Sequence, residues 1–331
     1  MAGARVKHAL RAAVNRVRGV LGLPAVEDRI TVQGQQLGGR LDLLGDAHHL
    51  TRLEVESAMA VAKQALHAAH VAQAHSETTA VTAARTERLG TISAVSSWIA
   101  HVEMPETTLV SVVMPTHNRA ALLARALASV TAQAYGNWEV LLVDDGSSDD
   151  TPSVLARYAD EPRVVVHRTE GVGSASARNV ALEAATGDVV VYLDDDNVFD
   201  PLWLKAVVWA FDQRPDVDVL YGARIIDDED RVRRVGSGAL PVLHFDPWDR
   251  PTIEDHNIVD LGTIAHRSKL TEARFDPQLS AHDDWDLILR ITEDHAPLEL
   301  PVVALYYTTD APNRLGDGDL SDQDLVRAKL R

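Results

Sequence analysis

Short β-rich runs alternate with amphipathic helical segments from Leu109 onward, and this alternation restricts the fold more than any other feature of the sequence. The pattern predicts strands at 110–114, 138–143, 163–167 and 188–193, with helices between them at 119–132, 150–159 and 173–186. Strands separated by helices of this length form right-handed βαβ units, so we predict a mainly parallel α/β sheet. Ligands of such sheets bind at the carboxyl ends of the strands.

Three of the predicted strands end in clusters of polar residues, which parallel strands would bring to one edge of the sheet. PTHNR follows the first strand, DDGSSDD the second and DDDN the fourth. Asp144 and Asp145 come directly after the apolar run of the second strand, and their carboxylates can accept hydrogen bonds from a base N–H or from ribose hydroxyls. The alternative for this cluster is a turn with a helix N-cap at Ser148 or Asp149.

The acidic run Asp194, Asp195 and Asp196 directly follows VVVYL, which is the pattern of a buried strand. Adjacent carboxylates repel one another unless a cation neutralises them. Hard oxygen ligands suit Mg²⁺ or Mn²⁺, which use one or two carboxylates together with diphosphate oxygens and water. The run therefore predicts a divalent metal site at the sheet edge, and the alternative is an acidic loop without a ligand.

The third predicted helix opens with a glycine-rich stretch and then carries Arg178 and Asn179. The N–H groups at a helix N-terminus, together with an arginine, can hold an anion. The alternative is that Arg178 is simply solvated.

These clusters, in this order, resemble those of the family 2 glycosyltransferases. The matching segments are VSVVMPTHNR ending at Arg119, VDDGSSDDT at 143–151, SARN at 176–179, YLDDDN at 192–197 and HDDWDL at 282–287. The resemblance runs from about Val110 to about Leu315 and is more specific for the family than for any donor or acceptor. It implies a GT-A fold, in which a nucleotide-binding α/β layer is extended by an acceptor-binding half, preceded here by an α-helical N-terminal region.

The resemblance assigns these clusters to a nucleotide-sugar donor. The residues that it implies for donor binding are Pro115, Thr116, His117, Asn118, Arg119, Asp144, Asp145, Arg178, Asn179, Asp194 and Asp195. Asp196 and Asp194 are implied as ligands of Mn²⁺ or Mg²⁺. A cation of this kind stabilises the charge that develops on a departing diphosphate.

Asp284 lies at the position of the family's acidic ED motif, where Asp283 replaces the more usual Glu. The resemblance implies that Asp284 is the catalytic base of an inverting reaction, because a carboxylate must take the acceptor proton opposite the leaving group. The alternative is that Asp283, Asp284 and Asp286 form the exposed face of a helix. Candidate acceptor contacts are Asp283, Trp285, Trp248, His256 and Asn257, whereas His244 and His266 are expected to be structural.

Two features depart from the family pattern. The QxxRW motif of the processive members is missing and RLGDGDL follows the last predicted strand, which favours transfer of a single sugar. No histidine follows Tyr306 and Tyr307, where some relatives place a further metal or phosphate ligand.

The first 105 residues lie outside the resemblance. Apolar residues recur at helical spacing over 5–21, and six Lys and Arg in residues 1–30 outnumber Glu27 and Asp28. This basic amphipathic helix either contacts an anionic membrane surface or packs on the protein itself. A second helical stretch runs over 53–99 and leads into a seam of Ile92, Val95, Ile99 and Val102. The seam predicts either a homo-oligomer formed through a coiled coil or a helix that flanks the catalytic domain.

Pro105 ends this helix and marks the predicted domain boundary. The expected organisation is a basic helix at 1–30, a helical and coiled-coil-like region with a linker at 31–105, the GT-A domain at 106–316 and a C-terminal tail at 317–331.

Composition restricts the function further. The net charge of −17 argues against nucleic-acid binding, which requires a basic surface. Cysteine is absent, so a metal must be held by oxygen or imidazole. No apolar run is long enough to span a bilayer and no signal-peptide core is visible, so we expect a cytoplasmic chain, at most peripheral at the inner face of the membrane.

The sequence therefore predicts an inverting, metal-dependent transfer of one sugar from a nucleotide-diphosphate sugar, with a UDP-sugar favoured. The expected acceptor is a hydroxyl of a glycan, lipid-linked or cell-surface precursor. The alternative is a non-catalytic sugar-nucleotide-binding or scaffolding protein that acts through its N-terminal helices. A related nucleotidyltransferase would need a Gly-rich, Arg-containing loop after the first strand, which PTHNR does not provide.

Overall fold

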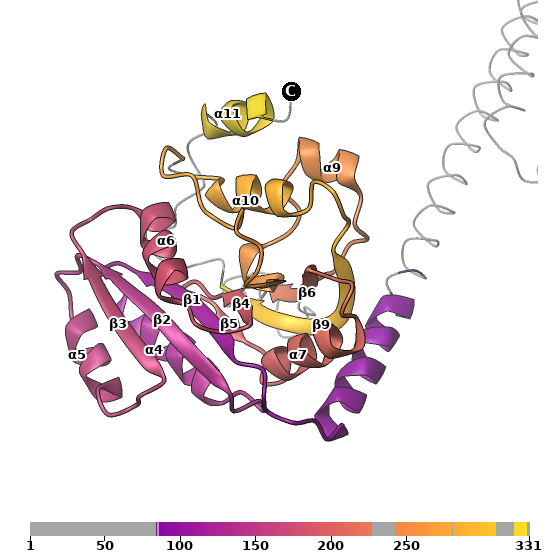
Figure 1. Ribbon diagram of the computed structural model, residues 1–331, viewed down its shortest axis with the longest axis horizontal. Helices are drawn as coiled ribbons and strands as arrows, with labels where there is room; N and C mark the ends of the chain where they lie inside the picture. The colour runs from indigo at the N-terminus through magenta and orange to yellow at the C-terminus, as the bar shows by residue number, and fades with distance from the viewer. Residues whose placement is uncertain (1–83, 85, 227–241, 280, 309–320, 330–331) are drawn as a thin grey trace, which may run out of the picture. The chain divides into compact units, whose positions relative to one another are not determined.

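The computed structural model describes residues 84, 86–226, 242–279, 281–308 and 321–329 (Figure 1). Nearly all of them belong to one compact unit, Arg88–Arg331. The predicted helix at 5–21 and most of the predicted stretch at 53–99 lie outside the described residues. Among the described helices, none has the length and apolar character needed to cross a membrane.

The first half of the unit is a parallel βαβ layer. Its elements in chain order are β1 (Val110–Thr116), α4 (Ala120–Thr131), β2 (Trp138–Asp145), α5 (Thr151–Leu155), η1 (Ala156–Tyr158), β3 (Val164–Thr169), α6 (Ser174–Ala184) and β4 (Val189–Tyr192). β1 pairs in parallel with both β2 and β4, and β3 pairs in parallel with β2. The sequence predicts each of these strands to within a few residues, because apolar runs of this length mark buried strands.

The second half extends the same sheet with strands of both directions. Its elements are β5 (Val198–Phe199), α7 (Trp203–Gln213), β6 (Val219–Ile226), β7 (Val242–His244), α9 (Arg250–Asp255), η2 (Leu261–Thr263), β8 (Ile264–Arg267), α10 (Asp283–Ile291), β9 (Leu298–Tyr307) and α11 (Ser321–Lys329). The strand order in the described sheet is β3-β2-β1-β4-β8-β6-β9-β5, with β7 paired to β6.

The predicted mainly parallel sheet is therefore a mixed sheet. β8 runs antiparallel to both of its neighbours, β4 and β6, and β5 runs antiparallel to β9. Because β8 is antiparallel to both β4 and β6, these two strands run in the same direction and their carboxyl ends lie at the same edge of the sheet. Parallel pairing holds among β1 to β4 and recurs between β6 and β9.

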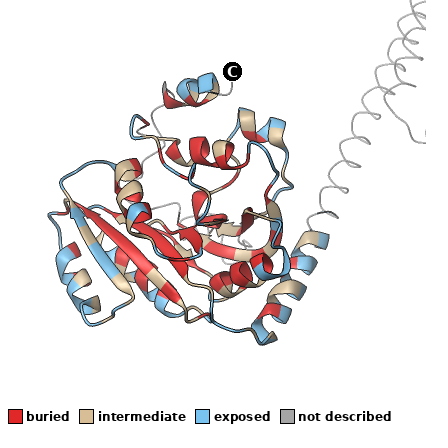
Figure 2. Cartoon of the chain, viewed as in Figure 1, coloured by how far each residue is buried: buried red, intermediate tan, exposed pale blue. Residues whose placement is uncertain are grey.

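Two hydrophobic cores cover the two faces of the sheet (Figure 2). Alternate residues of β1 supply both, because successive side chains of a strand point to opposite faces. Val110, Val112 and Met114 join the core formed with α4 and α7, whereas Val113 joins the core formed with α6 and α10. β1 is thus buried on both sides, which fixes the strand ends that carry the polar clusters.

Residues 88–101 of this unit are helical. Ile92 and Ile99 are buried, Ile99 lies in the core that contains α7, and Trp98 meets Trp209 edge to face with ring centroids 4.8 Å apart. Of the two readings of the Ile92 seam, the structure therefore supports the flanking helix, since these side chains pack on their own chain. The helical assignment ends at His101, ahead of Pro105.

The predicted C-terminal tail also differs from expectation. Its described part, 321–329, forms α11, and Val326 in this helix is buried in the core that contains α10. This end of the chain is part of the compact unit.

Candidate active site

The ends of β1, β2 and β4 meet, as the parallel arrangement predicts. Thr116 at the end of β1 donates its hydroxyl hydrogen bond to Asp195 Oδ2 over 2.7 Å. His117 Nδ1 lies 2.6 Å from the carbonyl oxygen of Asp145 at the end of β2. Pro115, one residue earlier, is within β1 and pairs with Val143 of β2. The structure thus brings the three predicted clusters to one edge.

Asn118 and Asp149 fasten the first cluster to the second. Asn118 adopts a left-handed backbone with φ of 54°, and its side-chain oxygen accepts the N–H of Ser148 over 2.7 Å. Asp149 accepts the N–H of Ala120 at the start of α4 and the N–H of Thr151 at the start of α5, each over 3.0 Å. The N-cap residue of α5 is Asp150 rather than Ser148 or Asp149, but the Asp149 carboxylate accepts N–H groups at the start of both helices.

Both oxygens of Asp145 accept hydrogen bonds from the loop that follows β3. Oδ1 accepts from the Thr169 hydroxyl and the Val172 N–H over 2.6 and 2.7 Å, and Oδ2 accepts from the Gly173 N–H over 2.8 Å. Burial opposes ionisation of Asp145, but these hydrogen bonds lower its pKa. Gly173 reaches this position with φ of 88°, a conformation that favours glycine. Asp145 thus holds the glycine-rich loop, and a direct contact with the base stays a prediction.

Asp144 is buried and is held by a residue that the sequence reasoning missed. Its Oδ2 accepts from Arg168 Nη1 over 2.7 Å, and its Oδ1 accepts the N–H of Ser147 over 2.9 Å. Arg168 is 56% exposed, so this cation stands at the surface above the carboxylate. Asp144 and Arg168 lie directly opposite each other in the register of β2 and β3, and this register is what could have identified the ion pair.

Arg119 already neutralises part of the acidic run. Its Nη1 lies 3.0 Å from Asp195 Oδ1 and 3.1 Å from Asp196 Oδ2. Asp195 and Asp196 are buried, whereas the side chain of Asp194 is 34% exposed. Burial raises the pKa of Asp195, although hydrogen bonds from Thr116 and Arg119 oppose the shift. The repulsion expected within the run is therefore reduced by a resident guanidinium, which the sequence reasoning assigned to the donor.

Arg178 is a buried bridge between two carboxylates. Its Nη2 lies 2.7 Å from Asp194 Oδ1, and its Nη1 lies 2.7 Å from Asp283 Oδ2. Burial lowers the pKa of Arg178, but the charges of Asp194 and Asp283 outweigh it and raise that pKa. The guanidinium is buried, so the alternative of a solvated Arg178 is wrong, and a contact with the donor stays a prediction.

The neighbouring Asn179 also has a structural task. Its Nδ2 donates to the Phe275 carbonyl and its Oδ1 accepts the Phe275 N–H, each over 2.8 Å. This two-way contact uses both ends of the amide and ties α6 to the segment before α10. The Asn179 amide is thus engaged by Phe275, and a donor contact through Asn179 stays a prediction.

Asp284 is the second residue of α10 and lies in an acidic, partly closed setting. Its Oδ2 accepts from Asn257 Nδ2 over 3.1 Å, and its Oδ1 accepts the N–H of Trp285 over 2.7 Å. Burial, then the charges of Asp283 and Asp260, raise the pKa of Asp284 to about 7. A carboxyl with this pKa can exchange a proton near neutral pH.

The alternative that the acids of α10 form an exposed helix face is wrong. Asp283 is 6% exposed and pairs with Arg178, and Asp286 is 2% exposed and pairs with Arg290 over 2.8 Å. Asp283 and Asp286 therefore face charged partners rather than solvent, and the half-buried Asp284 accepts from Asn257.

Three of the predicted acceptor contacts are also occupied within the protein. Asp283 is held by Arg178, as above. Trp285 is 1% exposed and donates its ring N–H to the Ile253 carbonyl over 2.7 Å, so it is a core residue. Trp248 packs beside Tyr221 with ring centroids 6.0 Å apart. Burial places Trp285 in the core, whereas Trp248 is only half-buried and its acceptor contact stays a prediction.

The three histidines differ in setting. His256 is 69% exposed, with its Nδ1 2.9 Å from Asp255. His266 is buried with its Nε2 2.7 Å from the Tyr192 hydroxyl, which agrees with a structural role. His244 instead lines a pocket.

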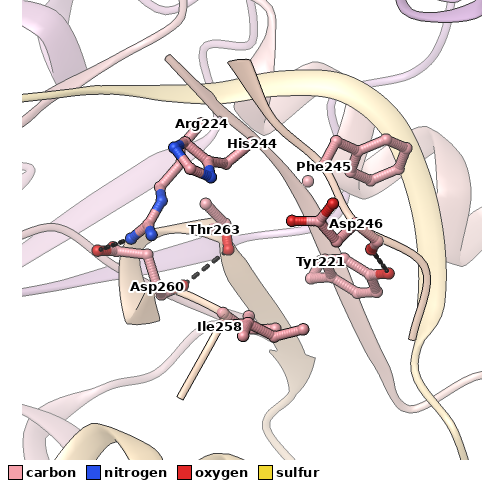
Figure 3. Close-up of a pocket in the computed structure, with 10 residues that line it drawn as sticks. Tyr221, Arg224, His244, Phe245, Asp246, Ile258, Asp260 and Thr263 are labelled. Carbon is pink, nitrogen blue, oxygen red and sulfur yellow. Dashed lines mark hydrogen bonds and ion pairs between the residues drawn. The ribbon is translucent and has the colours of Figure 1, made fainter. Parts of the chain in front are cut away.

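That pocket lies between β6, β7 and the η2 segment (Figure 3). Arg224 Nη1 is 3.1 Å from Asp260 Oδ2 across it. Burial raises the pKa of Asp260, Arg224 lowers it, and the charge of Asp194 raises it further. Asp260 acts in turn on Asp284, so one wall of the pocket lies within electrostatic reach of both acidic motifs. The polar lining residues are Tyr221, Arg224, His244, Asp246, Asp260 and Thr263.

The sequence reasoning missed this pocket because it is assembled from separate elements. Arg224, His244 and Asp260 come from β6, β7 and the residue before η2, and they form no motif in the chain. Only the pairing of β6 with β7 and β8 places them together.

The acidic run fits a divalent cation that is shared with a ligand. No three His, Asp or Glu side chains of the described residues gather into a complete metal cage. Asp194 and Asp196 offer two carboxylates at the sheet edge, and Mg²⁺ or Mn²⁺ commonly takes its remaining ligands from phosphate oxygens and water. The residues therefore suit an ion that arrives with a diphosphate.

The mixed sheet with this acidic edge defines a GT-A type glycosyltransferase domain. The structure of residues 1–349 of S. aureus TarS, in complex with UDP-GlcNAc, has a TM-score of 0.53 to this chain and 21% identity. The match covers 66% of this chain and 64% of that one. Residues 111–273 match Glycosyl transferase family 2, and the chain belongs to this family.

Curated relatives match parts of the chain. An uncharacterised protein, y4gI, of Sinorhizobium fredii is 36% identical over 191 residues, which are 56% of this chain and 20% of that protein. The putative colanic acid biosynthesis glycosyl transferase WcaA of Escherichia coli is 29% identical, covering 58% of this chain and 69% of that protein. The glucosyltransferase WfgD of Escherichia coli is 36% identical over 91 residues, which cover 28% of this chain and 36% of WfgD. This chain thus spans about a fifth of the length of y4gI.

We predict that Arg178→Met destabilises the compact unit by about 3 kcal/mol, because Asp283 would be left as a buried charge without its partner. The midpoint of chemical unfolding measures the loss. Arg214→Met is the matched control, since Arg214 also forms a 2.7 Å pair but with an exposed aspartate, Asp216. Its stability should stay nearly unchanged. Equal shifts in both variants would contradict the bridging role of Arg178.

Proposed function

We propose that this family 2 glycosyltransferase transfers a single sugar, with inversion, from a nucleotide-diphosphate sugar to an acceptor hydroxyl. A UDP-sugar is the favoured donor, and a glycan, lipid-linked or cell-surface precursor is the favoured acceptor. One observation carries the proposal. Asp284, with a pKa raised to about 7, is linked through the neighbouring Asp283 and through Arg178 to Asp194 of the acidic run. The candidate base and the candidate donor site therefore belong to one rigid cluster.

The residues of this cluster suit an in-line displacement. Asp284 accepts the proton of the acceptor hydroxyl while that oxygen bonds to the anomeric carbon, and the nucleotide diphosphate leaves from the opposite face. Asn257 fixes the carboxylate that takes the proton. Asp194 and Asp196 would hold Mn²⁺ or Mg²⁺, which supplies charge stabilisation for the diphosphate.

Names of relatives support the proposed substrates. WfgD is named as a transferase of glucose from UDP-glucose to a diphosphoundecaprenol-linked sugar, and WcaA is named for colanic acid biosynthesis. We extend a UDP-sugar donor and a lipid-linked or polysaccharide acceptor to this chain on that basis.

Two further proposals concern the setting of the enzyme. We infer a cytoplasmic protein with peripheral membrane contact through residues 5–21, which would bring the site to lipid-linked acceptors. Co-sedimentation with anionic liposomes, compared with a chain lacking residues 1–25, tests the contact. Equal co-sedimentation of both chains would exclude it.

We predict that Asp284→Asn abolishes transfer and leaves donor binding nearly intact, because the amide cannot accept the acceptor proton. UDP release from UDP-glucose, UDP-galactose or UDP-GlcNAc, with a panel of octyl glycosides as acceptors, measures transfer. Asp294→Asn, on the exposed segment after α10, is the matched control and should behave as the wild type. Near-normal transfer by Asp284→Asn would show that the base is another group.

We predict that Asp196→Ala removes the effect of divalent ions on donor binding, because it deletes one of the two carboxylates that fit a cation. Thermal shift measures donor binding, since a ligand that binds the folded state raises the melting temperature more as its site fills. Wild-type protein should be stabilised by nucleotide sugar with Mn²⁺ more than with EDTA. A shift that is the same with Mn²⁺ and EDTA would exclude a metal-dependent donor site.

The pH dependence of transfer follows from the raised pKa of Asp284. The base must be deprotonated, so kcat/KM should rise about tenfold per pH unit below about 7 and level off above it. An ordinary aspartate, with a pKa of about 4, would already give the plateau near pH 5.5. A profile that is flat from about pH 5.5 to 8.5 would therefore contradict an Asp284 base with this pKa.

A further inference from the structure

α11 packs against the helix that carries Asp284, and α10 lies between α11 and the sheet (Figure 1). Val326 of α11 is 1% exposed and belongs to the same core as Trp285. The guanidinium of Arg327 lies 5.7 Å from the Trp285 ring centroid and donates to the Asp255 carbonyl over 2.8 Å. The contact is therefore both apolar and polar.

One end of α11 holds the chain just before α10. Asp322 is 5% exposed, and its Oδ2 accepts the N–H of Ala281 over 2.7 Å. The next residue, His282, is left-handed with φ of 58° and has no side-chain cap hydrogen bond to α10. Few residues other than glycine adopt this conformation, although histidine tolerates it better than most, so contacts around the turn help to hold it. Asp322 of α11 thus holds the backbone at Ala281, one residue before the left-handed His282.

The other end of α11 holds the first turn of α10. Lys329 Nζ lies 2.8 Å from Asp286 Oδ1 and 2.6 Å from Asp276 Oδ2. Arg290 occupies the other oxygen of Asp286. The two anchors, Asp322 and Lys329, therefore enclose the stretch that contains Asp284.

We propose that Asp322 is a positioning residue for the transfer reaction. It fixes Ala281 and the left-handed His282, and so sets the direction in which α10 begins and the place of the Asp284 carboxylate. The proposal rests on the proposed function, in which Asp284 is the base. Asp322 itself does not belong to the acidic run, so its loss should act on the chemical step more than on donor binding.

The test compares three variants of the full chain. Asp322→Ala removes the acceptor of the Ala281 N–H, and Asp322→Asn keeps an oxygen that can accept it. Asp324→Ala removes an equal charge from the same helix, at a carboxylate that is 89% exposed. UDP release from the best UDP-sugar, with the best octyl glycoside and with water alone as acceptor, gives kcat. Thermal shift titration gives donor affinity.

Asp322→Ala should lower kcat about tenfold to a hundredfold, since a misplacement of about 1 Å costs this much, with donor affinity within about twofold of the wild type. Asp322→Asn should recover much of the loss, and Asp324→Ala should match the wild type. An Asp322→Ala protein with wild-type kcat, or one in which affinity falls as much as kcat, would overturn the proposal.

A second readout does not depend on turnover. Hydrogen exchange in the peptide that spans 281–286 should become faster in Asp322→Ala and stay unchanged in Asp324→Ala. Unchanged hydrogen exchange in Asp322→Ala would overturn the proposal whether or not the wild type transfers sugar. A wild type that transfers no sugar would count against the proposed function alone. Should Asp322→Ala not fold, Lys329→Met releases the other anchor, and wild-type kcat and exchange in that variant overturn the proposal.

Discussion

The buried guanidinium of Arg178 joins the two halves of the candidate site. It extends from α6 and pairs with Asp194, which follows β4 of the parallel βαβ layer, and with Asp283 at the start of α10. Arg178 and Asp283 are 105 positions apart in the chain. A buried charge is stable only with close partners, so the position of α10 relative to β4 cannot change without separating this triad. The proposed chemistry depends on that constraint, since Asp284 directly follows Asp283.

The same principle extends along the sheet edge. Arg119 pairs with Asp195 and Asp196, Arg168 pairs with Asp144, and the loop after β3 supplies N–H groups to Asp145. Each acid of the motifs thus has a protein partner before any ligand is bound. An edge organised in this way needs little rearrangement when it meets a substrate, which is the arrangement that electrostatic catalysis requires.

The sequence predicted the strands of the first half and the convergence of its acids, because apolar runs and the direction of parallel strands determine both. It did not predict the partners of those acids. Arg178 was expected at an anion and Asn179 at a donor, yet each is committed to a residue on a distant segment, Asp283 and Phe275. The reversal at β8, the pocket around Arg224 and the docking of α11 have the same origin. All three are contacts between distant segments: the first two depend on which strands pair, and the third depends on the packing of α11 against α10. No local pattern carries that information.

The antiparallel strand β8 separates two parts of the sheet that carry different sites. β4 ends in the acidic run, whereas β6 continues into the pocket and carries β7 as a branch outside the main strand order. Replacements in β7 or in the segment before η2 would reshape the pocket while leaving the contacts of Arg178 in place. A scaffold built in this way is modular, because the segments around the pocket can vary while the ion pairs of Arg178 stay in place.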